Sequence, residues 1–132
     1  MATVPLIDYD HASPAVRAVY DDIKQLRGVD DVNNFWKSLA NAPTQLAQVW
    51  SEVKTVMQPG ALDALTKELI YVAVSASNSC AYCVHSHTAA ARAKGMTAEQ
   101  HAELLAVVAL ASRTNALANS LQVPVDPQFQ MS

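Results

Sequence analysis

Two consecutive helices are predicted by residues 62–95, LDALTKELIYVAVSASNSCAYCVHSHTAAARAKG. Apolar side chains recur every three or four positions in the first half of this stretch, which is the spacing of a helix face. The polar run at residues 75–79 favours a turn with helix caps, and Gly95 is a common helix end. We expect a buried helix over about 62–75 and a second helix over about 80–94. The apolar positions of the first helix are Leu62, Leu65, Leu69, Val72, Ala73 and Ala76.

Capping and breaking residues mark four more helices outside this stretch. Ser13 and Pro14 form an N-cap followed by a first-turn proline, and Gly28 is a typical stop. Thr97 and Gln100 have the spacing of a capping box. The predicted helices cover about Pro14–Arg27, Phe35–Leu39, Pro43–Met57 and Thr97–Leu121. Their inward stripes include Leu26, Phe35, Trp36, Trp50 and Val56, which we expect in the core.

The composition favours a single all-α domain over residues 1–132. The chain is 51% hydrophobic and contains 3 glycines and 6 prolines, so helices are favoured over sheets with many turns. Its length suits one domain that closes a hydrophobic core without disulfide or metal staples. We therefore predict a compact bundle of about six helices.

Charge and hydropathy exclude several classes of partner. The formal net charge is −3 and the 9 basic residues are scattered, so no surface for nucleic acid or an anionic membrane is indicated. No secretion signal and no apolar run of bilayer length is recognisable, and we expect a cytoplasmic protein. Two cysteines three positions apart, in a reducing compartment, are typical of reactive or metal-binding thiols.

Cys80, Cys83 and His87 form the chemically informative group of the sequence. At spacings of three and seven residues, all three lie along one stripe of a continuous helix, so imidazole and thiol can meet. Cys80 falls in the first helical turn, where free N–H groups and the helix dipole stabilise a thiolate. A thiolate attacks a peroxide oxygen or a disulfide sulfur, and a neighbouring cysteine can capture the sulfenic acid as a disulfide.

Glu68 lies in an otherwise apolar part of the preceding helix. An isolated carboxylate is costly to bury there, so we expect a polar partner, and His87 is the candidate. This pairing would fix the imidazole tautomer and let His87 act as the base for the neighbouring thiol.

A zinc site is the main alternative interpretation of the same residues. Cys80, Cys83, His85 and His87 supply four suitable ligands within eight residues. On a continuous helix, however, His85 points about 140° away from Cys80, so the four side chains cannot converge without unwinding. The sequence therefore favours a redox pair without a bound metal, and a metal-holding module remains the less favoured alternative.

Around these residues the sequence resembles the alkyl hydroperoxidase D-like (AhpD-like) family of the carboxymuconolactone decarboxylase superfamily. The shared pattern is Glu-x11-Cys-x2-Cys-x3-His, here Glu68, Cys80, Cys83 and His87. The resemblance extends over about Tyr20–Pro124 and is strongest over residues 60–100. One difference is Tyr82, which stands where the best-studied hydroperoxidases have a histidine.

The resemblance implies a helical fold, assembly into trimers or hexamers, and reduction of small hydroperoxides without a cofactor. Cys83 would attack the peroxide, Cys80 would resolve the intermediate, and His87 and Glu68 would relay protons. An unidentified dithiol would supply the electrons. The alternatives are a lactone enzyme of the decarboxylase type, whose relatives typically lack the paired cysteines, and a non-enzymatic redox-sensing module.

The hydrophobic pattern independently indicates self-association. The Leu62–Ala76 run is apolar nearly all round and Leu104–Ala111 is similarly broad, whereas charged residues are only 16% of the chain. Exposed apolar patches beyond a few hundred Å² usually mark association surfaces. We therefore expect a homo-oligomer.

Overall fold

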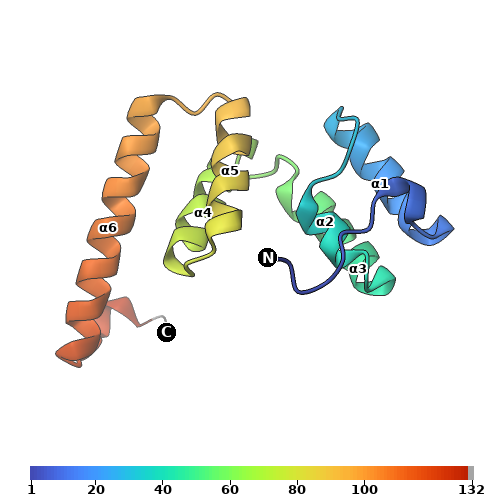
Figure 1. The fold of residues 1–132 in the computed structure, drawn as a ribbon. Helices are drawn as coiled ribbons and strands as arrows, with labels where there is room; N and C mark the ends of the chain where they lie inside the picture. Colours follow the sequence, from blue (N-terminus) through green and yellow to red (C-terminus); the bar gives the residue numbers. More distant parts are fainter. Residues whose placement is uncertain (131–132) are drawn as a thin grey trace. The chain divides into compact units, whose positions relative to one another are not determined.

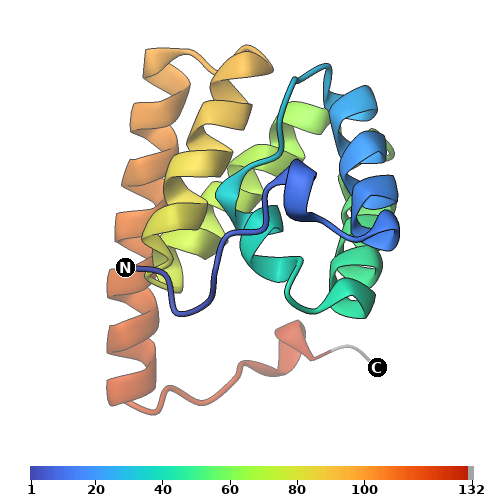
Figure 2. The ribbon, with the colours of Figure 1, turned by 45° about the vertical axis from the view of Figure 1, so that its right-hand side comes forward.

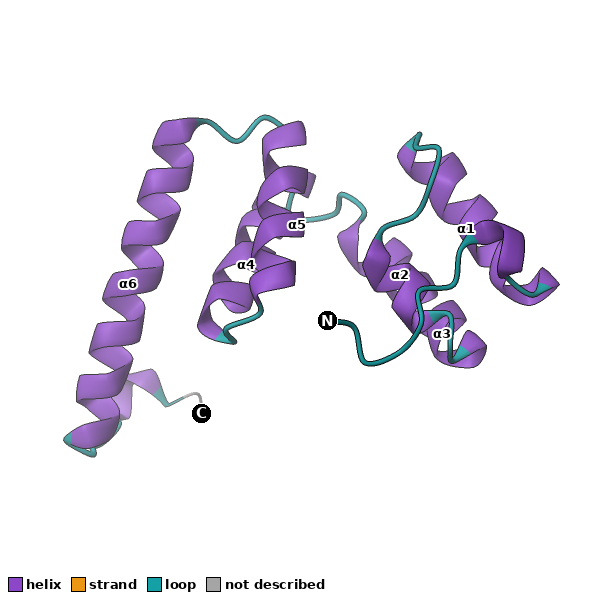
Figure 3. Ribbon diagram, in the orientation of Figure 1, coloured by secondary structure: helices purple, strands orange, loops and turns teal. Residues whose placement is uncertain are grey.

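The computed structural model describes residues 1–130, which form helices joined by short loops (Figure 3). No strand occurs in this range, which confirms the predicted all-α class with six α-helices. Two 3-10 turns, η1 (Tyr9–His11) and η2 (Pro127–Phe129), lie near the ends. The helices, labelled in Figure 1, are α1 (Pro14–Arg27), α2 (Asn34–Leu39), α3 (Pro43–Met57), α4 (Ala64–Ser77), α5 (Ala81–Ala93) and α6 (Ala98–Ser120).

The predicted capping residues account for several of these boundaries. Ser13 Oγ accepts a hydrogen bond from the N–H of Val16 at 3.3 Å, and Pro14 occupies the first turn of α1. Gly28 ends α1 with a φ of +64°, a left-handed conformation that glycine adopts at little cost. At the start of α6, Thr97 and Gln100 make both hydrogen bonds of a capping box.

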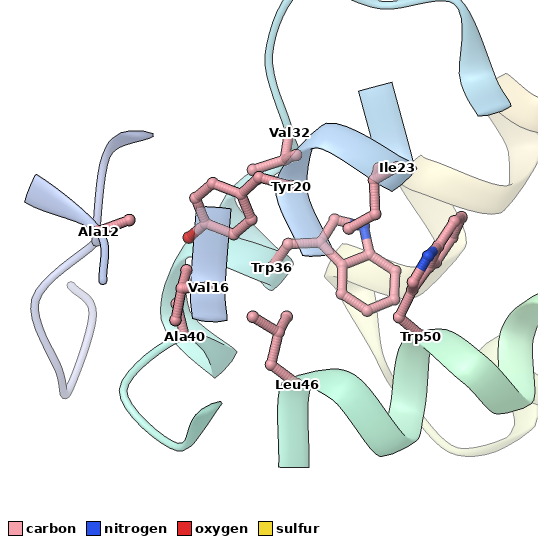
Figure 4. Packing of buried hydrophobic residues seen from close by; sticks show 9 residues of the cluster. All are labelled: Ala12, Val16, Tyr20, Ile23, Val32, Trp36, Ala40, Leu46 and Trp50. Atoms are coloured by element: carbon pink, nitrogen blue, oxygen red, sulfur yellow. The ribbon is translucent and has the colours of Figure 1, made fainter. Parts of the chain in front are cut away.

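The helices fall into two compact groups, residues 1–58 with α1–α3 and the described residues from Pro59 onward with α4–α6. In the first group, α1 and α2 both pack against α3. Figure 4 shows the core, where Trp36 and Trp50 meet edge to face with ring centroids 5.5 Å apart. The Nε1–H of Trp50 donates to Asp22 at 2.7 Å, which satisfies its polar atom at the core boundary.

Three side chains predicted to lie in this core are exposed instead. Phe35 is 44% exposed, although its ring still contacts the edge of Trp36 at 5.0 Å between centroids. Leu26 and Val56 are 64% and 55% exposed. Both lie in the last turn of their helices. The periodic pattern therefore predicted the helices correctly and the burial of these three side chains wrongly.

In the second group, α4 packs along α5 and also contacts α6. Figures 1 and 2 show α4 and α5 side by side in both views. The buried positions of α4 are Glu68, Val72 and Ser75, one stripe of the helix. The expected burial of this helix is found on this stripe, whereas Ile70 and Val74 are exposed in the single chain.

The long helix α6 has no buried residue along its 23 positions. Its apolar side chains therefore remain accessible in the single chain. None of the helices described for residues 1–130 is both long enough and apolar enough to cross a membrane. The exposed large apolar residues of α6 are Leu105, Val107, Leu110 and Leu117.

Candidate functional site

Cys80 and Cys83 form a disulfide at the start of α5. The structure corrects the expected position of Cys80, which lies just before the first helical turn as the N-cap residue. Its Sγ accepts a hydrogen bond from the N–H of Cys83 at 3.3 Å, as a serine oxygen would at this position. Cys83 is in the first turn, and both cysteines are half-buried. Cys83 and His87 therefore lie in one continuous helix with the expected spacing, whereas Cys80 lies outside that helix.

The tight link between α4 and α5 brings the cysteines to this position. Ser79 adopts a left-handed backbone with a φ of 58°, which reverses the chain direction directly after α4. The N–H of Cys80 then donates to the carbonyl of Ser75 at 3.0 Å and closes the end of α4. Cys80 thus belongs to the caps of both helices.

Glu68 of α4 pairs with His87 of α5, as the sequence predicted. Glu68 Oε2 lies 2.8 Å from His87 Nδ1, and the carboxylate side chain is only 7% exposed. An ionised carboxylate can only accept, so Nδ1 carries the hydrogen, and in the neutral imidazole the lone pair is then on Nε2. The pair therefore orients the imidazole with a basic nitrogen facing away from Glu68.

Two neighbours of this pair were not predicted. Lys94 Nζ lies 3.2 Å from the second carboxylate oxygen, Glu68 Oε1. The ring of Tyr71 stacks on the ring of His87, with centroids 3.6 Å apart and 18° between the planes. Helical spacing puts Tyr71 near the face of Glu68, three positions away, and Lys94 near the face of His87, seven positions away, but does not show that the two faces meet.

The electrostatics of the pair favour an ionised Glu68. Burial alone would raise the pKa of this carboxyl group. The hydrogen bonds from His87 and Lys94 outweigh burial and hold the pKa below its ordinary value of 4.5. Glu68 therefore remains a hydrogen-bond acceptor for His87 at neutral pH.

The residues of the zinc interpretation do not come together. His85 is exposed, whereas His87 is half-buried and held by Glu68. Within residues 1–130, no three His, Cys, Asp or Glu side chains gather as metal ligands would. The arrangement that the structure shows is a cysteine pair with a carboxylate-oriented histidine farther along the same helix.

Comparison with known proteins places the chain in a family. Residues 44–126 match the model of the carboxymuconolactone decarboxylase family, and the chain belongs to that family. Within it, the chain is AhpD-like. Its fold matches a crystal structure of the alkylhydroperoxidase AhpD core from Rhodospirillum rubrum with a TM-score of 0.96. The two chains are 58% identical, and the match covers 100% of this chain and 99% of the other.

Matches to individual sequences are shorter. An uncharacterized protein of the cox locus of Paracoccus denitrificans is 45% identical over 56 residues, 42% of this chain and 50% of that protein. An uncharacterized protein of Cupriavidus necator is 36% identical over 78 residues, 58% of this chain and 69% of that protein. Alkyl hydroperoxide reductase AhpD of Solibacter usitatus is 42% identical over 65 residues. This last match covers 49% of this chain and 35% of that protein.

Proposed function

We propose that the protein reduces organic hydroperoxides through a Cys80–Cys83 dithiol–disulfide cycle. One observation carries the proposal: the disulfide lies at the N-terminus of α5, on the helix that also presents the Glu68-oriented His87. His87 follows Cys83 by four residues, and helical side chains lean toward the N-terminus, so the imidazole leans toward Cys83. The names of the alkylhydroperoxidase relatives support the same chemistry.

In the first step, Cys83 is the nucleophile of the reduced protein. His87 Nε2 accepts the thiol proton, and the first turn of α5 stabilises the resulting thiolate. The thiolate sulfur bonds to the terminal hydroperoxide oxygen as the O–O bond breaks. Cys83 becomes a sulfenic acid, and the departing alkoxide takes a proton from His87 and leaves as an alcohol. Glu68 keeps Nδ1 protonated throughout.

In the second step, Cys80 resolves the sulfenic acid. Its sulfur bonds to the sulfur of Cys83, hydroxide leaves as water with the proton of the Cys80 thiol, and the disulfide of the structure results. An external dithiol then reduces this disulfide and is itself oxidised. The cycle converts one hydroperoxide and one dithiol into one alcohol, one water and one disulfide.

A single-turnover experiment tests this function. Protein reduced with dithiothreitol and freed of reductant is mixed with one equivalent of cumene hydroperoxide. We expect one cumyl alcohol per chain, the loss of two hydrogens in the intact mass, and the loss of both titratable thiols. The variant carrying Cys80→Ser and Cys83→Ser is the control and should yield no alcohol.

The rival functions predict different products. A redox sensor would form the disulfide once but show no sustained alcohol production with excess dithiothreitol. A lactone enzyme would leave both thiols titratable and form no alcohol. Unchanged thiols after hydroperoxide treatment would contradict the proposed peroxidase function.

A further inference from the structure

Each oxygen of the Glu68 carboxylate has its own partner. Oε2 pairs with His87 Nδ1 at 2.8 Å, and Oε1 pairs with Lys94 Nζ at 3.2 Å. His87 and Lys94 are seven residues apart, about two helical turns, and Lys94 is the C-cap residue of α5. The carboxylate of α4 is therefore held between two groups of one neighbouring helix.

The charges around this carboxylate balance in a simple way. The side chains that hydrogen-bond to Glu68 and lower its pKa are His87 of α5 and Lys94, the C-cap residue of the same helix. Helix α6 also packs against α4 but contributes no group to this set. On its own helix, Tyr71 covers the His87 ring. With Glu68 ionised and Lys94 protonated, the imidazole faces a pair without net charge.

We propose that Lys94 is a positioning residue whose charge offsets that of Glu68 and so weakens the pull of this carboxylate on a second proton at His87. A carboxylate without Lys94 would attract a proton to the neighbouring imidazole, because opposite charges favour the ionised form of a base. A protonated His87 has no lone pair on Nε2 and cannot accept the Cys83 proton. The consequence of Lys94 for catalysis rests on the proposed peroxidase function, whereas the effect of Lys94 on His87 does not.

The direct test is an NMR titration of the His87 ring in the oxidised protein without peroxide, at low ionic strength. The His87 signal is assigned by its absence in His87→Gln. In Lys94→Met we expect the His87 titration midpoint to move upward by about half a pH unit relative to the parent protein. The shift is small because the Lys94–Glu68 ion pair is partly exposed to solvent. Lys94→Arg keeps the charge and should restore the parent midpoint.

Arg92→Met is the matched control, because it removes a positive charge from an exposed position of the same helix. Its His87 midpoint should stay at the parent value. If Lys94→Met fails to fold, Lys94→Gln carries the same test. An unchanged midpoint in the folded neutral variant, or an equal shift in Arg92→Met, would overturn the role of Lys94.

The same variants separate this inference from the proposed function. If hydroperoxides are substrates, turnover of Lys94→Met should fall off on the acidic side at a higher pH than in the parent protein, by the same amount as the NMR midpoint moves. A shifted midpoint in a protein that never produces alcohol would support Lys94 and refute the peroxidase. Alcohol production with an unshifted midpoint would support the peroxidase and refute the role of Lys94.

Discussion

Tyr71 covers one face of His87, with the two rings 3.6 Å apart between centroids and nearly parallel. The same imidazole is held at its Nδ1 by Glu68, so two residues of α4 fix one side chain of α5. A ring restrained at one edge and one face has few remaining orientations. Its Nε2 is consequently aimed by packing as well as by hydrogen bonding.

Replacement of Tyr71 should therefore slow turnover by freeing the His87 ring. Aromatic pairs contribute about 0.5–1.5 kcal/mol, so we expect Tyr71→Leu to lower the rate with hydroperoxide by about twofold to tenfold. Tyr71→Phe keeps the stacked ring and should retain most of the activity. Steady-state rates with excess dithiothreitol measure both. Equal losses in the two variants would assign the effect to the hydroxyl group instead of the stack.

The two cysteines should have different roles. Cys83→Ser should abolish alcohol production, because the proposed nucleophile is missing. Cys80→Ser should permit one attack and stop at a sulfenic acid, since no resolving thiol remains. Trapping with dimedone followed by intact-mass measurement distinguishes the two. Sustained turnover of both single variants with a dithiol reductant would contradict this division.

Glu68 should stabilise the fold in a pH-dependent way. Its pKa is depressed in the folded chain, so its contribution is present above its ordinary pKa of 4.5 and is lost as pH falls through the folded value. At pH 7 we expect Glu68→Gln to lower the free energy of unfolding by about 2 kcal/mol, and the difference should shrink below pH 4.5.

Urea unfolding of the oxidised protein at several pH values, at equal protein concentration, measures this difference. Glu52→Gln is the control, because Glu52 is an exposed glutamate of α3. A difference that persists unchanged at pH 3 would show that the charge of Glu68 is not its source.

Self-association is proposed from the exposed apolar side chains of α6. Leu110 is 63% exposed on this helix, which buries none of its own residues in the single chain. We expect light scattering after size exclusion to give a multiple of 14.2 kDa, with a trimer or hexamer suggested by the family resemblance. Leu110→Glu should lower the mass, and Leu26→Glu, at a leucine of α1 that is 64% exposed, should not. A parent mass of 14.2 kDa would refute the assembly.

The strongest sequence signals fixed helix boundaries closely. The predicted bounds, about Pro14–Arg27 and about Pro43–Met57, coincide with the observed helices, because proline at the start and a breaker at the end act locally. The pairing of Glu68 with His87 was also predictable, since a carboxylate in an apolar stripe requires a polar partner.

Other features depend on contacts between helices that periodicity does not encode. Lys94 reaches Glu68 across 26 positions, and its role depends on how α4 and α5 align. The exposure of Ile70 and Val74 in the single chain also depends on how the helices pack. An apolar pattern shows that a face avoids water, but does not show whether the same chain or a second copy covers it.

The position of Cys80 links electron transfer to local unfolding. Its Sγ accepts a hydrogen bond from the Cys83 N–H, and its own N–H donates to the end of α4. Opening of the link between α4 and α5 therefore disturbs the same residue that is oxidised and reduced. If the disulfide makes the link between α4 and α5 harder to open, then by thermodynamic reciprocity an intact link favours the disulfide over the dithiol. Amide hydrogen exchange in the first turn of α5 should therefore differ between the oxidised and reduced protein. Substitutions that fray this turn should shift the dithiol–disulfide equilibrium without touching a sulfur atom.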